Sequence, residues 1–325
     1  MNVNYNYFEK MLHHLSLGNK IIRNTMFQLE AFFFKNKNYI SEKNHVFICG
    51  LPRSGTTVIL EAIRKSNIFA SLTYRDMPFI LSPNINRILF KYSNTKSIIR
   101  SHNDGIFYNI DSPEALDEVF FKTYDTDELE KYLLIYISLI LKKYKKEKYL
   151  SKNNNILEKI DIIKKVLKNS IFLLPFRDPL QHSNSLLLQH KNFTNLQNNN
   201  QFIVDYMDYL GHNEFGKNHV SWNKSKKFYD FEDINYWLEQ WFLYYENILK
   251  NYSNKKDLFL ISYNNICASK QKFIKLLNEN NIEINQNYNF KKSERKINFV
   301  YKKELLKDCL DLFANLNSKF NSYTT

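Results

Sequence analysis

Short apolar runs alternate along the chain with stretches in which apolar residues recur every three or four positions. Continuous apolar runs bounded by turn-forming residues are typical of buried strands; the clearest are 46–49, 171–176 and 257–262. The three-to-four spacing is typical of amphipathic helices; it is clearest in 129–145, 156–167 and 236–249. This alternation predicts an α/β fold of three layers, with helices covering a mostly parallel sheet.

The chain shows no internal repeat and no linker-like stretch, so we expect a single domain over residues 1–325. Residues 1–44 form a helical N-terminal extension in this prediction, because their apolar residues recur at helical intervals. This extension is basic and aromatic. We favour its packing on the rest of the domain, and contact with a membrane surface is the alternative. Residues 191–230 are polar and weakly periodic, which indicates a long insertion or lid.

The stretch His45–Thr57 combines an apolar strand, a glycine-containing loop and the start of a helix. Backbone N–H groups and the positive end of the helix dipole converge at such a turn, so the stretch predicts an anion site. Gly50 and Gly55 have the glycine spacing of a nucleotide-triphosphate P-loop, but Thr56 stands where that motif requires lysine. The cation of the loop is Arg53 instead. A tight turn without a ligand is the alternative interpretation.

A second polar junction, R-D-P, follows the apolar run 171–176. Asp178 is a good N-cap and Pro179 a good first helical residue, so a helix should begin here. Arg177 then lies at the carboxyl end of a strand, where open α/β sheets bind ligands. Ser185 follows about two turns into the helix. Simple helix capping beside a surface arginine is the alternative.

Composition narrows the class of protein without choosing a ligand. Lys and Arg number 46 against 33 Asp and Glu, which gives a net charge of +13. This balance suits a polyanionic ligand, nucleic acid or an anionic membrane, although solvated surface lysine is the interpretation that we favour. Cys49, Cys267 and Cys309 are far apart and lack metal-ligand spacing, which predicts reduced thiols and a cytoplasmic protein. No signal peptide is visible, and the longest apolar run, Leu133–Leu141, is far shorter than the roughly 20 residues of a membrane span.

Taken in order, these motifs resemble the sulfotransferases that use 3′-phosphoadenosine-5′-phosphosulfate (PAPS). P-R-S-G-T-T at Pro52–Thr57 looks like the loop that binds the 5′-phosphosulfate in that family. The strand before R-D-P, with Arg177 and Ser185, looks like its 3′-phosphate site. L-S-K-N, which contains Lys152, looks like the family's lysine segment near the sulfuryl group. I-S-Y-N-N-I, which contains Tyr263, is similar to its R-Y-E-D-L stretch. The likeness covers residues 45–270 and is closest to an uncharacterised bacterial branch.

The resemblance implies a P-loop NTPase-like α/β fold and a sulfotransferase that works without a metal. Its co-substrate would be PAPS, its product PAP, and its acceptor a hydroxyl or amine, with a carbohydrate or lipid-linked molecule favoured and nucleic acid not expected. The implied donor-binding residues are Pro52, Arg53, Ser54, Gly55, Thr56, Thr57, Arg177, Ser185 and Tyr263. Arg53 and Lys152 would also stabilise negative charge on the leaving phosphate and the sulfuryl oxygens.

The general base is left open by the sequence. Some branches of the family use a histidine, and the tyrosylprotein branch uses a glutamate a short way past the loop arginine. Asp76, in T-Y-R-D-M-P, lies near that second position and is the favoured base. Its alternative role is an ion pair with Arg75 that shapes the loop. His102 is the second candidate, with Asp104 and Glu114 behind it.

Two other functions compete with this reading. The first is a P-loop nucleotide kinase or NTPase with a degenerate loop. Thr56 in the lysine position disfavours it, and no clear acidic metal ligand follows an apolar strand. The second is a basic protein that binds nucleic acid, which ranks last because the chain has no recognisable nucleic-acid module and no basic–aromatic repeat.

Overall fold

The computed structural model describes residues 5–35, 42–90, 98–99, 107–225, 227–228 and 230–323. The strands are β1 (Val46–Ile48), β2 (Phe69–Ala70), β3 (Ile98–Ile99), β4 (Phe107–Tyr108), β5 (Lys148–Lys152), β6 (Ile171–Phe176) and β7 (Leu258–Ser262). The α-helices are α1 (Tyr7–Gly18), α2 (Lys20–Phe34), α3 (Thr56–Arg64), α4 (Pro83–Leu89), α5 (Glu118–Thr123), α6 (Thr126–Tyr144), α7 (Ile160–Val166), α8 (Pro179–Asn198), α9 (Gln201–Tyr209), α10 (Ile234–Asn251), α11 (Tyr263–Ala268), α12 (Gln271–Glu279) and α13 (Lys303–Ser322). Two short 3-10 helices are η1 (Tyr74–Asp76) and η2 (Ile156–Lys159).

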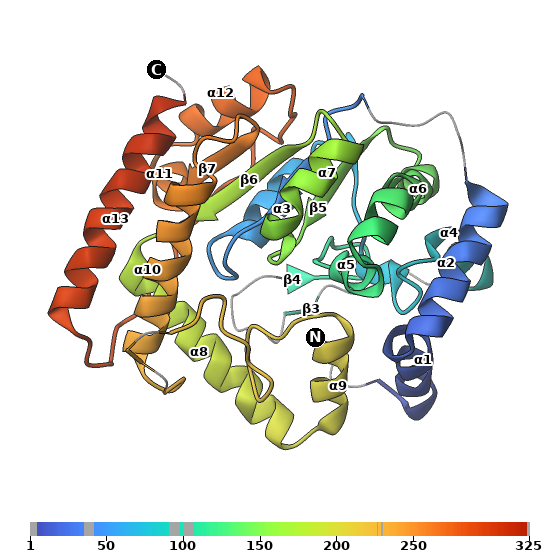
Figure 1. Cartoon of the computed structure of the whole chain (residues 1–325), viewed down its shortest axis with the longest axis horizontal. Helices are drawn as coiled ribbons and strands as arrows, with labels where there is room; N and C mark the ends of the chain where they lie inside the picture. Colours follow the sequence, from blue (N-terminus) through green and yellow to red (C-terminus); the bar gives the residue numbers. More distant parts are fainter. Residues whose placement is uncertain are drawn as a thin grey trace.

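Five parallel strands form the central sheet, in the order β2-β5-β1-β6-β7. β1 lies in the middle, with Ile48 beside Lys152 of β5 and Leu173 of β6. The strands are joined through helices (Figure 1). Because parallel crossovers are right-handed, α3 belongs to one face of the sheet and α6 and α7 to the other. The predicted α/β fold with helices flanking a mostly parallel sheet is confirmed.

The middle of the sheet is buried on both faces, as its uninterrupted apolar strands predict. Every residue of β1 and β6 is buried. Phe47 stacks on Phe172 of the neighbouring strand, with ring centroids 5.3 Å apart. This packing fixes the carboxyl ends of β1, β5 and β6 side by side, which is where the polar motifs begin.

The N-terminal extension consists of two helices instead of one continuous helix. Asn19 separates them, and its side chain accepts hydrogen bonds from the backbone N–H groups of Ile21 and Ile22. α1 packs on α9 and α2 packs on α6 (Figure 1). The extension therefore contacts the rest of the molecule through both of its helices.

Residues 191–230 contain more helix than their polarity indicates. α8 continues to Asn198 and α9 follows almost at once, so the first half of this interval is helical. The helices are stabilised by a small second core in which Phe193 and Met207 pack with Trp237 of α10. The few apolar residues of this interval are enough to hold the helices in place, because they pack together in this core. The role of the interval as a lid stays a prediction.

Candidate active site

The connection between β1 and α3 is a tight loop with unusual backbone angles. Gly50, Arg53 and Gly55 have φ values of 119°, 69° and 108°. A Cβ atom added at Gly55 would lie 2.4 Å from Cδ2 of Tyr263, so only glycine fits between the loop and that ring. The first N–H groups of α3 face this turn, because a helix N-terminus leaves them without intrahelical partners. The loop therefore has the geometry of an anion site.

Side chains of helix α8 form hydrogen bonds with the loop. His182 Nε2 donates to the carbonyl oxygen of Pro52 at 2.8 Å. Burial, together with the positive charge of Arg177, lowers the pKa of His182 to about 3, so its ring is neutral. One turn further along α8, Ser185 Oγ accepts from Arg53 Nε at 3.1 Å. The predicted loop cation and the predicted serine of the second site are thus in direct contact.

Arg177 links the loop to a segment near the end of the chain. Its Nη1 donates to the Arg53 carbonyl oxygen at 3.4 Å, and its Nη2 donates to the Ser293 carbonyl oxygen at 2.8 Å. Burial lowers the pKa of Arg177. Among the described residues Arg177 has no carboxylate within ion-pair distance, although the charge of the adjacent Asp178 acts on it. A small hollow beside Arg177 is lined by Tyr263, by Lys292 with its ion-pair partner Glu294, and by Asp178.

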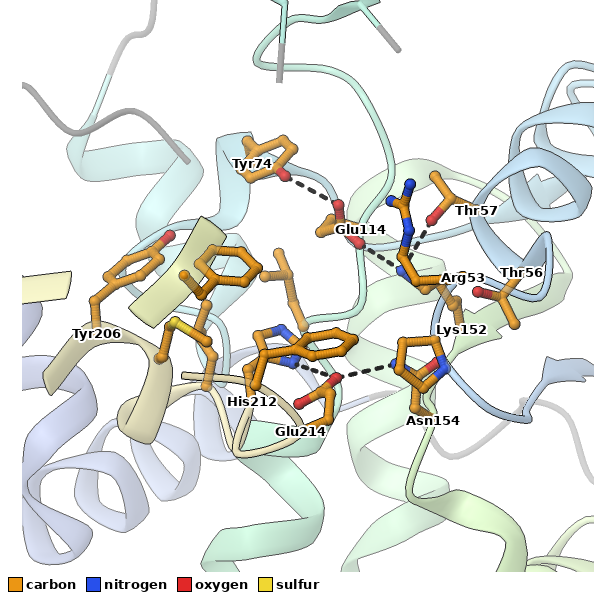
Figure 2. A pocket seen from close by; sticks show the side chains of 16 residues that line it. Arg53, Thr56, Thr57, Tyr74, Glu114, Lys152, Asn154, Tyr206, His212 and Glu214 are labelled. Carbon is orange, nitrogen blue, oxygen red and sulfur yellow. Dashed lines mark hydrogen bonds and ion pairs between the residues drawn. The ribbon is translucent and has the colours of Figure 1, made fainter. Parts of the chain in front are cut away.

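Lys152 joins the loop to a buried carboxylate. It ends β5, next to β1, and its Nζ donates to Thr57 Oγ1 and to Glu114 Oε1, both at 2.9 Å. Glu114 Oε2 accepts from the hydroxyl of Tyr74 at 3.0 Å. Lys152 and Glu114 are each less than a tenth exposed, and both line the same cavity as Arg53 and Thr57 (Figure 2).

The far wall of this cavity is mostly apolar, with one histidine–glutamate pair. Phe193 and Tyr206 contribute rings from α8 and α9. His212 Nδ1 lies 3.5 Å from Glu214 Oε1, which also accepts from Asn154 Nδ2 at 3.1 Å (Figure 2). Burial disfavours both charges, but their mutual attraction raises the pKa of His212 and lowers the pKa of Glu214. The attraction between the two groups therefore outweighs the effect of burial in both.

Asp76 does not line the cavity. It is fully buried, and its Oδ2 accepts from the Thr73 backbone N–H at 2.7 Å and the Tyr144 hydroxyl at 2.6 Å. Its Oδ1 pairs with Lys143. Arg75, which we expected to pair with Asp76 in its alternative role, pairs with Asp111 instead. The expected ion pair Arg75–Asp76 is therefore wrong. The structure brings Glu114 to Lys152 and does not bring Asp76 there.

The other candidate bases have different outcomes. His102 and Asp104 lie outside the described residues. Glu114, which the sequence ranked behind Asp76 and His102, occupies the cavity. The predicted donor-binding residues converge, since the loop Pro52–Thr57 contacts Ser185, Arg177 and Tyr263 directly. Sequence reasoning missed Tyr74, His212 and Glu214, which stand in weakly periodic stretches and match no spacing rule.

Other features bear on cofactors and membranes. Within the described part of the chain, no group of three or more His, Cys, Asp or Glu side chains is arranged to hold a metal ion. Cys49, Cys267 and Cys309 are not joined in disulfides. None of the described helices combines the length and apolarity needed to cross a membrane.

Comparison with known proteins gives structural similarity only. No protein-family model matches the chain, and no curated protein does. Among solved structures, the chain is similar to sulfotransferase STF9 from Mycobacterium avium, with 13% identity, coverage of 97% of this chain and 79% of that chain, and a TM-score of 0.44. It is also similar to sulfotransferase STF1 from Mycobacterium tuberculosis H37Rv, with 10% identity, coverage of 98% and 87%, and a TM-score of 0.45. A third is the sulfotransferase domain from the curacin biosynthetic pathway, with 13% identity, coverage of 75% and 76%, and a TM-score of 0.37.

Proposed function

We propose that the protein is a sulfotransferase that moves a sulfuryl group from PAPS to a hydroxyl or amine of an acceptor. One observation carries this proposal. Lys152 Nζ bridges Thr57, at the start of the helix behind the anion loop, and Glu114, which lines the cavity. A cation and a candidate base therefore meet at the point where an anion held by the loop would face an acceptor.

The residues present suit a donor with phosphate groups at two positions of its ribose. The loop N–H groups and Arg53 suit the 5′-phosphosulfate. Ser185 and Arg177 lie beside that loop, and the guanidinium of Arg177 contacts backbone carbonyls, with no carboxylate ion-paired to it in the described chain. These two residues suit the 3′-phosphate, because a guanidinium binds phosphate through charge-assisted hydrogen bonds.

The proposed reaction assigns a role to each of these residues. In the proposed step Glu114 takes the proton of the acceptor hydroxyl, whose oxygen forms a bond to sulfur. The bond between sulfur and the 5′-phosphate oxygen breaks, and PAP leaves with the electron pair of that bond. Lys152 and Arg53 stabilise the negative charge that grows on the leaving oxygen. Lys152 must release Glu114 for this, and the sulfuryl oxygens compete for its ammonium group.

The primary test is binding of PAP to the purified protein without magnesium. PAP should raise the melting temperature, because a ligand that binds only the folded state stabilises it. Ser185→Ala and Arg177→Ala should reduce that shift. Arg87→Ala serves as the matched control, since Arg87 is an exposed arginine of α4 that lines neither the loop nor the cavity. The melting temperature of each variant without ligand reports whether its fold is intact.

The competing function gives the opposite result. A nucleotide kinase or NTPase would be stabilised by magnesium and ATP, and PAP would have no effect. That outcome would overturn the proposal. Transfer of labelled sulfate from PAPS to an acceptor, measured without added metal, is the second test, because in this proposal Lys152 and Arg53 supply the positive charge.

A further inference from the structure

The outer face of helix α2 exposes large apolar side chains to solvent. The exposed residues of α2 recur at helical intervals and form one face, opposite the buried residues that pack on α6. Toward the end of the helix this face consists of Leu29, Phe32 and Phe33, and the two phenylalanines are 82% and 65% exposed. Their rings meet edge to face, with centroids 5.1 Å apart. In Figure 1 α2 lies at the right-hand edge of the molecule.

Large apolar side chains are exposed mainly in this part of the molecule. Helix α4 packs on α2, and its last turn exposes Ile88 and Leu89. Helix α1, which also packs on α2, exposes Tyr7 and Phe8. Outside these three helices, the exposed large apolar residues of the described chain are Val220, Phe231, Val300 and Leu310. Single exposed apolar residues are ordinary, whereas a concentration of them marks an interaction surface.

The charged groups beside the end of α2 are cations. Lys35 follows the helix directly and is exposed. Lys142 of α6 is also exposed; its Nζ lies 5.3 Å from the ring centroid of Phe34 and donates to the Phe34 carbonyl oxygen at 3.1 Å. Glu30 is the one carboxylate of α2, and it is fully buried, where it accepts from the backbone N–H of Asn84 at 2.8 Å.

The carboxylates of the neighbouring helix lie away from the phenyl rings. Those of α6 are confined to its first two turns, at Asp127, Glu128 and Glu130. Just before this end of α6, the Tyr124 hydroxyl donates to Asn24 Oδ1 of α2 at 2.9 Å. Asn24 precedes Phe32 by about 12 Å along the helix axis. Glu147, beyond the other end of α6, is paired with Lys43. The end of α2 therefore combines exposed aromatic rings with cations at their margin.

We propose that the end of α2 binds the surface of a membrane that contains anionic lipids. Phe32 and Phe33 enter the boundary between headgroups and acyl chains, and Lys35 and Lys142 attract the anionic headgroups. The net charge of +13 favours an anionic surface and disfavours a second copy of this chain, which carries the same charge. Membrane contact is compatible with the packing of the N-terminal extension, because the two use opposite faces of α2. This inference does not depend on the proposed function.

The test is co-sedimentation of the full chain with vesicles of phosphatidylcholine alone and of equal parts phosphatidylcholine and phosphatidylglycerol. The protein should bind the mixed vesicles more tightly, and added salt should weaken that binding. Combining Phe32→Ser with Phe33→Ser should weaken binding to the mixed vesicles about tenfold, because the apolar area that enters the membrane is lost. The melting temperature should not fall, since both rings are exposed. Val300→Ser is the matched control, because Val300 is 92% exposed and lies outside α1, α2 and α4.

A pair of lysine variants tests the cations separately from the net charge. Lys35→Gln and Lys307→Gln each remove one positive charge from an exposed position, but Lys307 lies on α13, at the opposite edge of the molecule in Figure 1. Lys35→Gln should therefore weaken binding to the mixed vesicles more than Lys307→Gln does. Equal effects of the two variants would refute a role for the cations beside the phenyl rings.

Other results would overturn the membrane site. Absence of binding to the mixed vesicles refutes it. Unchanged binding in the double phenylalanine variant also refutes it, because the attraction then comes from the net charge alone. Light scattering tests the other occupant: a dimer that the double variant abolishes, in a protein that binds no vesicles, would assign this surface to a second copy of the chain. Stabilisation by PAP should be equal in the parent and the double variant, so either result leaves the sulfotransferase proposal to its own test.

Discussion

Two buried lysine–carboxylate pairs, Lys143–Asp76 and Lys152–Glu114, stand close in the chain but differ in their surroundings. Both lysines are less than a tenth exposed. Asp76 is fully buried, and both of its oxygens are held by Lys143, Tyr144 and the Thr73 backbone. Glu114 lines a cavity, and its lysine also contacts the anion loop through Thr57.

The difference teaches that a buried charge pair is not in itself a sign of catalysis. A carboxylate whose oxygens are all held inside the core fixes the local backbone, and a substrate cannot reach it. A carboxylate that lines a cavity can exchange a proton with a ligand, especially when the cation beside it also contacts the loop. Position relative to the loop, which depends on the fold, separates the two roles.

The largest expected effect is on Glu114. Glu114→Gln keeps the size of the side chain and removes its basicity, so kcat should fall by about 10²–10⁴-fold, the usual contribution of a general base. PAP affinity should stay within a few-fold of the parent value. Steady-state kinetics with saturating PAPS measures the change. A variant with the parental kcat would show that Glu114 is not the base. The two lysine–carboxylate pairs would then no longer differ in catalytic role.

Asp76→Asn should affect stability more than turnover. It leaves Lys143 buried without its counter-charge, which costs about 3–5 kcal/mol of unfolding free energy. Urea denaturation measures the loss. Turnover per folded molecule should stay near the parent value, because Asp76 does not line the cavity.

A matched double variant sharpens that prediction. Asp76→Asn combined with Lys143→Met removes both charges and should recover part of the lost stability. Abolished turnover in a folded Asp76→Asn protein would reinstate the role that the sequence favoured for this residue.

A smaller effect is expected at His182, a buried group that supports the loop without an ion pair. Its folded-state pKa of about 3 lies below the ordinary value of 6.5, so the unfolded chain binds a proton first as the pH falls. Stability from neutral His182 is complete above pH 6.5 and decreases toward pH 3. The loss is about 2 kcal/mol at pH 5.

His182→Gln should remove this pH dependence while keeping an N–H donor for the Pro52 carbonyl. Unfolding free energies at pH 8 and pH 5 are compared between parent and variant. The difference isolates His182, since Asp117, whose pKa burial raises to about 6, titrates with the opposite sign in both proteins. The same pH dependence in both proteins would contradict the prediction.

The smallest effect is expected at the exposed pair Arg75–Asp111. Asp111 is 55% exposed, and Arg75 is 25% exposed. Asp111→Asn should change the unfolding free energy by no more than about 1 kcal/mol, as is usual for surface pairs. Denaturation under the conditions used for Asp76→Asn gives the comparison. A loss as large as that of Asp76→Asn would show that burial does not separate these pairs.

The parts of the fold that could be predicted are those set by neighbouring residues. The apolar run 171–176 coincides with β6, and the cap formed by Asp178 before Pro179 begins α8 as expected. The anion loop could also be predicted, because its strand, glycines and helix follow one another directly in the sequence. Its contacts with Arg177 and Ser185 were expected only through the resemblance to a family.

The base could not be ranked from the sequence, because its position depends on pairing between distant segments. An isolated bridge joins Thr73 to Pro113, and the N–H of Glu114 donates to the Leu72 carbonyl oxygen. These contacts set Glu114 beside Tyr74. Distance along the chain from Arg53 favoured Asp76, but η1 turns its carboxylate back onto the Thr73 N–H. His212 and Glu214 lie in an irregular segment whose sequence has no hydrophobic periodicity, so no pattern predicts their positions.

Tyr263, whose ring covers Gly55, also sets an order of events during synthesis on the ribosome. β1, the loop and α3 leave the exit tunnel first, while α11 is still to be made. β7 must then join β6 before the ring can reach the loop. We therefore expect a nascent chain to acquire its anion site only after α11 has emerged. Ligand capture by such a chain would report that its final strand has docked.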